Sequence, residues 1–136
     1  MVNSIEFFPN GVRVKFSGRV TAQEILDTNS EILNHSNFST TKFSIWVYQD
    51  IGQMEYSKGQ IRALGDSDRA TSLKNPDRQV AIVADSPYVF GLGRMYEAYY
   101  GDGPWKIKIF YDLNEAEEWV KFHDQEGVLA NLLAGS

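Results

Sequence analysis

The sequence contains no cysteine, which excludes disulfide bonds, thiolate metal ligands and cysteine nucleophiles. Histidine is almost as scarce, because His35 and His123 are the only two. Neither has a second histidine at a ligand spacing such as His-x-x-x-His, so we expect no metal site at either position. No other motif indicates a bound group, and the sequence therefore predicts no cofactor.

A surplus of positive charge is also absent, since 13 Lys and Arg stand against 18 Asp and Glu for a net charge of −5. Nucleic-acid binding needs a basic face, so this balance argues against it. Basic and acidic residues are interleaved in one region, at Arg62, Asp66, Asp68, Arg69, Lys74, Asp77 and Arg78. Mixed signs of this kind are typical of a solvated helix surface, which is what we expect here.

Long apolar runs are missing as well, and no stretch reaches the roughly 18 residues of a membrane-spanning helix. Residues 1–6 lack the basic start and apolar run of a secretory signal. We therefore expect a cytoplasmic protein without a transmembrane segment. The 136 residues are 43% hydrophobic and 23% charged, which is the composition of an ordinary globular domain.

The first part of the chain has the pattern of a β-hairpin. An apolar run at 5–8 is followed by the turn-forming residues Pro-Asn-Gly at 9–11. Residues 12–16 then alternate apolar and polar, as a half-buried strand does. These two runs predict an antiparallel N-terminal hairpin.

Three strand–helix units follow a first helix at 22–34, which opens with the capping box Thr21…Glu24. The expected strands are 43–48, 80–84 and 106–110. The first is followed by a helix at 57–75, although Gly65 and a polar run interrupt its apolar stripe. The other helices begin at the N-cap pair Ser86-Pro87 and at a second capping box, 112–115.

This order predicts one α/β domain over residues 1–126, with an N-terminal antiparallel hairpin followed by three parallel strand–helix units. Residues 127–136 form an apolar C-terminal tail. An apolar tail has to cover something to stay soluble, and either its own domain or a second copy of the chain would serve.

Two segments carry a family resemblance. Residues 113–120, Leu-Asn-Glu-Ala-Glu-Glu-Trp-Val, have an Ala-x-x-Trp-aliphatic pattern, and residues 80–85 read Val-Ala-Ile-Val-Ala-Asp. With the order of elements, they resemble the SpoIIAA-like (STAS-type) fold, in its small uncharacterised bacterial branch. The resemblance covers about 5–122, and its motifs are mostly core patterns, which specify a fold better than a function.

The resemblance implies a protein-binding switch, because STAS domains act as such switches. Their control point is Asp-Ser-Ser-Gly, with a phosphorylated serine, at the end of the first parallel strand. This sequence has Asp50-Ile51-Gly52 at the matching place, so the phosphorylated hydroxyl does not carry over.

No catalytic constellation is present, and we predict that the chain is not an enzyme. There is no Gly-x-Ser-x-Gly elbow, and the Gly91-Leu92-Gly93 segment lacks the third glycine of a phosphate loop. Asp50 and Asp85, at the ends of two strands, are the only candidates for an acid or base.

Aromatic residues are unusually dense near the third helix, at Tyr88, Phe90, Tyr96, Tyr99, Tyr100 and Trp105. One helix face cannot bury them all, so they either fill the core or form a ligand or partner surface of Tyr88, Phe90, Tyr96, Tyr100 and Trp105. The leading hypothesis is a regulatory or protein-interaction module that self-associates, with a homodimer as its simplest form. The alternative is a binder of a small apolar ligand such as a lipid, as in Sec14-type carriers, whose core the SpoIIAA-like fold resembles.

Overall fold

The structure, a computed structural model, describes residues 2–36 and 38–120. Its sheet has five strands in the order β1-β2-β3-β4-β5, which is also their order in the sequence. They are β1 (Val2–Phe8), β2 (Gly11–Thr21), β3 (Phe43–Glu55), β4 (Gln79–Ala84) and β5 (Lys106–Phe110). β1 is antiparallel to β2, and every other neighbouring pair is parallel. The predicted fold class, a hairpin followed by parallel strands, is confirmed.

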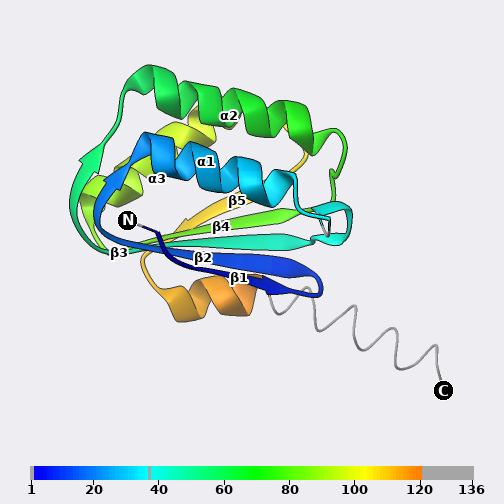
Figure 1. The fold of residues 1–136 in the computed structure, drawn as a ribbon, viewed down its shortest axis with the longest axis horizontal. Helices are drawn as coiled ribbons and strands as arrows, with labels where there is room; N and C mark the ends of the chain where they lie inside the picture. The colour runs from blue at the N-terminus through cyan, green and yellow to red at the C-terminus, as the bar shows by residue number, and fades with distance from the viewer. Residues whose placement is uncertain (1, 37, 121–136) are drawn as a thin grey trace.

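Helices cover both faces of the sheet (Figure 1). One face carries α1 (Ala22–Leu33), α2 (Lys58–Ser72) and α3 (Pro87–Tyr100), and a short 3-10 helix (Phe38–Thr40) follows α1. The helix at 113–120, orange in Figure 1, lies on the opposite face. The sheet is thus the middle layer of three.

The helix starts follow local capping chemistry. The Thr21 hydroxyl accepts a hydrogen bond from the Glu24 N–H at 3.1 Å, and the Glu24 carboxylate accepts one from the Thr21 N–H at 3.2 Å. The Ser86 hydroxyl accepts from the N–H of Val89, with Pro87 in the first turn. These contacts confirm the predicted caps, since each satisfies an N–H that has no partner within the helix.

β3 is longer than predicted, because it continues beyond Tyr48 as far as Glu55. Its polar second half pairs with the end of β2, and the register shifts on either side of Gly18. Gly18 and Asp50 both have positive φ, of 69° and 52°. Asp tolerates this conformation better than most residues, and the Asp50 N–H donates to the Asp85 carboxylate at 3.0 Å. The irregularity breaks the apolar alternation, so the sequence pattern ends the strand too early.

Each face of the sheet has its own apolar core. The core under α1, α2 and α3 includes Val12, Val14, Phe16, Trp46, Tyr48, Val80 and Ile82 from the strands, with Ile25, Ile61, Val89 and Tyr96 from the helices. The core on the opposite face consists of Ile45, Val47, Ala81, Val83, Phe110, Ala116 and Val120. All residues of β4 are buried, as its continuous apolar run predicts for a parallel strand covered on both faces.

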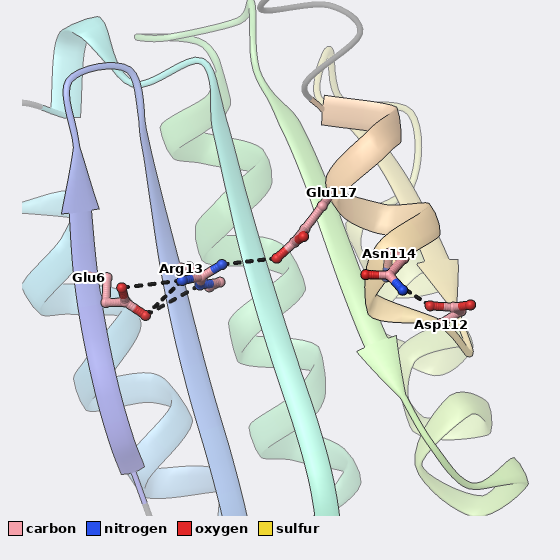
Figure 2. Close-up of polar contacts among 5 residues, drawn as sticks. All are labelled: Glu6, Arg13, Asp112, Asn114 and Glu117. Atoms are coloured by element: carbon pink, nitrogen blue, oxygen red, sulfur yellow. Dashed lines mark hydrogen bonds and ion pairs between the residues drawn. The ribbon is translucent and has the colours of Figure 1, made fainter.

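The helix at 113–120 is held by apolar packing and by two ion pairs that share one arginine (Figure 2). Ala116 and Val120 are buried, and Trp119 packs its ring 5.6 Å from the ring of Phe110. Arg13 joins this helix to the hairpin, because its guanidinium contacts Glu6 at 3.0 Å and Glu117 at 2.9 Å. The Ala-x-x-Trp-aliphatic pattern is therefore a core-packing signal.

The start of that helix differs in detail from the predicted capping box. The Asp112 carboxylate accepts a hydrogen bond from the N–H of Asn114 at 2.8 Å, one residue before the expected partner, Glu115 (Figure 2). The acceptor still satisfies an N–H of the first turn, so the helix begins where the sequence predicted.

Gly65 explains why the stripe of α2 is interrupted. A Cβ at this position would lie 2.8 Å from the Tyr99 Cβ and from the Tyr100 backbone nitrogen. The absence of a side chain therefore lets α2 and α3 approach closely. Gly91, on the exposed side of α3, has no such neighbour.

Alanine substitutions at these two glycines should act in opposite directions. We expect Gly65→Ala to lower the free energy of unfolding by roughly 1–3 kcal/mol, because the new methyl group meets backbone atoms of α3. Gly91→Ala should raise it by about 0.5–1 kcal/mol, because alanine is the better helix former. Urea unfolding of both variants measures the difference, and equal effects would contradict the close helix contact.

Candidate functional site

A cavity lies between the helical layer and the centre of the sheet. Its free volume is about 60 Å³, taken as the space open to the centre of a water molecule. At 10–15 Å³ for each water, this is room for roughly four to six water-sized groups. The lining residues come from α1 (Ile25, Asn29), α2 (Ile61, Leu64, Asp68), α3 (Val89, Leu92, Gly93, Tyr96) and β3 and β4 (Trp46, Tyr48, Met54, Val80, Ile82).

The cavity wall is mainly aliphatic and aromatic. The indole N–H of Trp46 donates to the Ser44 hydroxyl at 3.1 Å, so it is satisfied by its own strand. Tyr48 is buried and stacks on Phe16, with ring centroids 5.1 Å apart. A pocket of this kind, apolar with a few polar groups, is typical of small-molecule sites.

One carboxylate stands in this apolar wall. Asp68 is only 5% exposed, and each of its oxygens accepts a hydrogen bond from another helix. The Asn29 amide of α1 donates to Oδ1 at 2.8 Å, and the Tyr96 hydroxyl of α3 donates to Oδ2 at 2.6 Å. Asp68 itself belongs to α2, so the cluster joins all three helices on this face.

Burial determines the proton affinity of this cluster. Burial raises the pKa of Asp68 above its ordinary value, against the hydrogen bonds from Tyr96 and Asn29 and the positive charge of Arg78, which lower it. The pKa of Tyr96 is also raised, by burial and by the neighbouring Asp68 carboxylate. Tyr96 therefore stays a neutral donor, and Asp68 binds a proton more readily than an exposed aspartate does.

Arg78 supplies a buried positive charge near Asp68. Its guanidinium carbon lies 5.1 Å from the centre of the Phe38 ring and 4.7 Å from that of Trp105. Burial lowers the pKa of Arg78 to about 10, so the side chain is still charged at neutral pH. Its Nε is buried and has no hydrogen-bond partner among the residues that the structure describes. Attraction to the two rings replaces part of the lost hydration.

The sequence-based interpretation of this charged region is wrong for Asp68 and Arg78. It predicted a solvated helix surface, but both side chains are buried. Asp68 lies on the same buried face of α2 as Ile61 and Gly65. Arg78 directly precedes β4, which is covered on both faces. Alternating charge along the sequence does not report which side chain faces inward.

The predicted aromatic residues occupy three different settings. Tyr96 lines the cavity. Tyr100 and Trp105 are buried and stacked on each other, and the backbone N–H of Trp105 donates to the Tyr100 hydroxyl at 2.7 Å. Tyr88 is 56% exposed, and Phe90 stacks on Tyr111 with ring centroids 4.2 Å apart. The five residues therefore do not surround one pocket.

The remaining candidates lie outside the cavity. Asp50 is exposed within β3, Asp85 is exposed directly after β4, and His35 stacks on Phe7 with ring centroids 4.0 Å apart. Across residues 2–36 and 38–120, no group of three or more His, Asp or Glu could hold a metal ion. No helix in this part of the chain is long and apolar enough to cross a membrane. His123 and the tail at 127–136 lie outside the described residues.

Sequence reasoning missed Asn29, Tyr48 and Asp68 as members of one site. A signal existed for Asn29, an amide residue that shares the buried side of α1 with the apolar residues Ala22, Ile25 and Ile32. No comparable signal exists for Asp68, because neighbouring charges surround it in the sequence.

The raised pKa of Asp68 predicts a pH-dependent stability. The folded chain holds the Asp68 proton to a higher pH than the unfolded chain, so its contribution to stability is lost as pH rises from the ordinary aspartate value through the raised one. We expect the free energy of unfolding of the native chain, minus that of Asp68→Asn, to fall as the pH rises above the ordinary aspartate value of about 4. Urea unfolding at several pH values tests this, and a difference that rises with pH would contradict the raised pKa.

Comparisons with known proteins give one structural likeness. No protein-family model matches the chain, and no curated protein matches it. The chain is similar in structure to an uncharacterized protein of the DUF3478 family from Shewanella loihica PV-4, described as having a SpoIIAA-like fold. The two are 16% identical with a TM-score of 0.47, over 88% of this chain and 91% of the other. The fold named for that protein is the one that the sequence of this chain predicted.

Proposed function

We propose that the protein is a non-catalytic module that binds a small, mostly apolar ligand in its core cavity. The observation that carries the proposal is an apolar cavity that contains the buried carboxylate of Asp68. The ligand class is the alternative predicted from the sequence, but the site differs. It is the space under α1, α2 and α3, and of the predicted aromatic residues only Tyr96 lines it.

The energetic cost of this arrangement supports a role in binding. An unfilled volume of 60 Å³ costs about 1.5 kcal/mol of stability at the usual rate for core cavities. A buried carboxylate adds to this cost, because its two hydrogen bonds only partly replace water. The unfilled volume and the buried carboxylate occur at the same place, and a ligand that fills the cavity would offset the cost of the unfilled volume.

The lining residues favour binding over catalysis. The wall residues within 2–36 and 38–120 include no serine, cysteine, histidine or lysine, and the partners of Asp68 are an amide and a neutral phenol. A nucleophile paired with a positioned base is therefore absent from this wall.

Filling the cavity should abolish binding. Val80→Ile with Val89→Ile adds one methyl group at each of two wall positions and keeps both side chains β-branched. We expect native mass spectrometry of the gently purified native chain to show a bound small molecule, or uptake of added methylcyclopentane, and the double variant to show neither. Val83→Ile, on the opposite face of the sheet, is the matched control for added volume. Equal uptake by the double variant, or none by the native chain, would contradict the proposal.

A second candidate function is protein interaction, which the sequence predicted as the leading hypothesis. It is favoured by exposed aromatic side chains, namely Tyr88 on α3 and, separately, the stacked pair of Phe90 and Tyr111. Tyr88 and Tyr111 are each 56% exposed, and Phe90 is held against Tyr111 by stacking. Exposed aromatic side chains held by a helix or by ring stacking are typical of protein-binding surfaces.

Self-association through these exposed aromatic side chains is testable by light scattering. If two copies pair there, Tyr88→Ser with Tyr111→Ser should change a dimer mass into a monomer mass, because the largest exposed rings are lost. A chain that ends at Glu126 tests the predicted alternative, pairing through the tail. A monomer mass for the full native chain at high concentration would contradict self-association by either route.

A further inference from the structure

We propose that the ligand of the core cavity is a small neutral alcohol or phenol, bound through its hydroxyl group at Asp68 and Tyr48. This inference rests on the proposed function, since it names the chemical class that the same cavity accepts. It follows from the polar groups that line the cavity and from the charge beside it.

The Asp68 carboxylate has acceptor capacity left over. A carboxylate offers about four lone-pair sites, and each oxygen of Asp68 accepts one hydrogen bond, from Asn29 or from Tyr96. A ligand hydroxyl can donate to one of the remaining sites. When Asp68 is protonated it becomes a donor as well, and a hydroxyl can then accept from it. A hydroxyl therefore matches this side chain in both protonation states, which a pure donor or a pure acceptor does not.

Tyr48 provides a second, independent polar group. It lines the cavity and is 8% exposed, and its hydroxyl makes no hydrogen bond to the residues that the structure describes. The pKa of Tyr48 is raised by burial and by the negative charge of Asp68, so its hydroxyl remains a neutral donor and acceptor. The Tyr48 hydroxyl is not among the fully buried polar atoms, so it keeps some accessible surface at the cavity wall, where a polar ligand group can hydrogen-bond to it.

The charges around the cavity favour a neutral ligand. Arg78 is buried, has no ion pair with the described residues, and lowers the pKa of Asp68 through its positive charge. It therefore already balances the carboxylate. A cationic ligand would add an uncompensated positive charge to an apolar interior, and an anionic one would be repelled by Asp68.

The free volume limits the apolar part of the ligand. Room for roughly four to six water-sized groups corresponds to a short branched or cyclic hydrocarbon with one hydroxyl. Met54 and Leu64 are the partly exposed members of the aliphatic wall, so a larger body would have to displace one of these side chains.

Three compounds with one ring and equal size test the chemistry: cyclopentanol, methylcyclopentane and cyclopentylamine. Their dissociation constants are measured by NMR titration of the full chain, followed at the amides of Leu64 and Gly93 beside the cavity. We expect cyclopentanol to bind about tenfold more tightly than methylcyclopentane, the gain of one hydrogen bond to a charged or strongly polar group. Cyclopentylamine should bind more weakly than cyclopentanol.

Variants identify the groups responsible. Asp68→Leu should remove the preference for cyclopentanol while methylcyclopentane still binds, and Tyr48→Phe should reduce the preference about threefold. Asp66→Leu, on α2 outside the cavity wall, is the matched control and should leave the ratio of affinities unchanged. If Asp68→Leu does not fold, Tyr48→Phe decides the test, because it removes only one hydroxyl.

The outcomes separate this inference from the proposed function. Equal affinity for cyclopentanol and methylcyclopentane, or a preference that persists in both variants, would overturn the alcohol class and leave apolar binding intact. Tighter binding of cyclopentylamine would overturn the neutral ligand. No binding of any of the three would overturn the proposed function and this inference together.

Discussion

The Asp68 carboxylate is the contact on which the helical layer depends. It lies on α2 and accepts hydrogen bonds from Asn29 of α1 and Tyr96 of α3, so one buried side chain connects three helices. Apolar packing sets the distance between the helical layer and the sheet, but such packing is not directional. The two hydrogen bonds are directional and fix how the helices lie relative to one another.

Much of the fold follows from local patterns. The Thr21…Glu24 spacing directly before an apolar stripe is a local signal for the start of a helix, and the apolar run of β4 favours burial on both faces. The second half of β3 could not be predicted in this way. It is a strand because β2 continues beside it, with irregular register at Gly18 and a positive φ at Asp50. Such pairing depends on residues far apart in the sequence.

The candidate site was predictable only in part. Tyr96 fitted the buried stripe of α3, and it does line the cavity. Tyr100 and Trp105 instead satisfy each other, and the Trp105 indole N–H donates to the Asn75 carbonyl at 2.6 Å. Asp68 was hidden because a charged residue in a charged segment resembles a surface residue. Only the close approach of α2 and α3 at Gly65 shows which face of α2 is inside.

The same group that organises the helices therefore also controls the chemistry of the cavity. Because its pKa is raised by burial, proton uptake and the proposed ligand binding act on the same carboxylate. A ligand hydroxyl that donates to Asp68 stabilises the charged form, and so it must lower the affinity of Asp68 for its proton. By the same linkage, protonation must weaken any ligand that depends on the negative charge. A binding module of the proposed kind couples ligand occupancy, local charge and the mutual arrangement of α1, α2 and α3 through a single side chain.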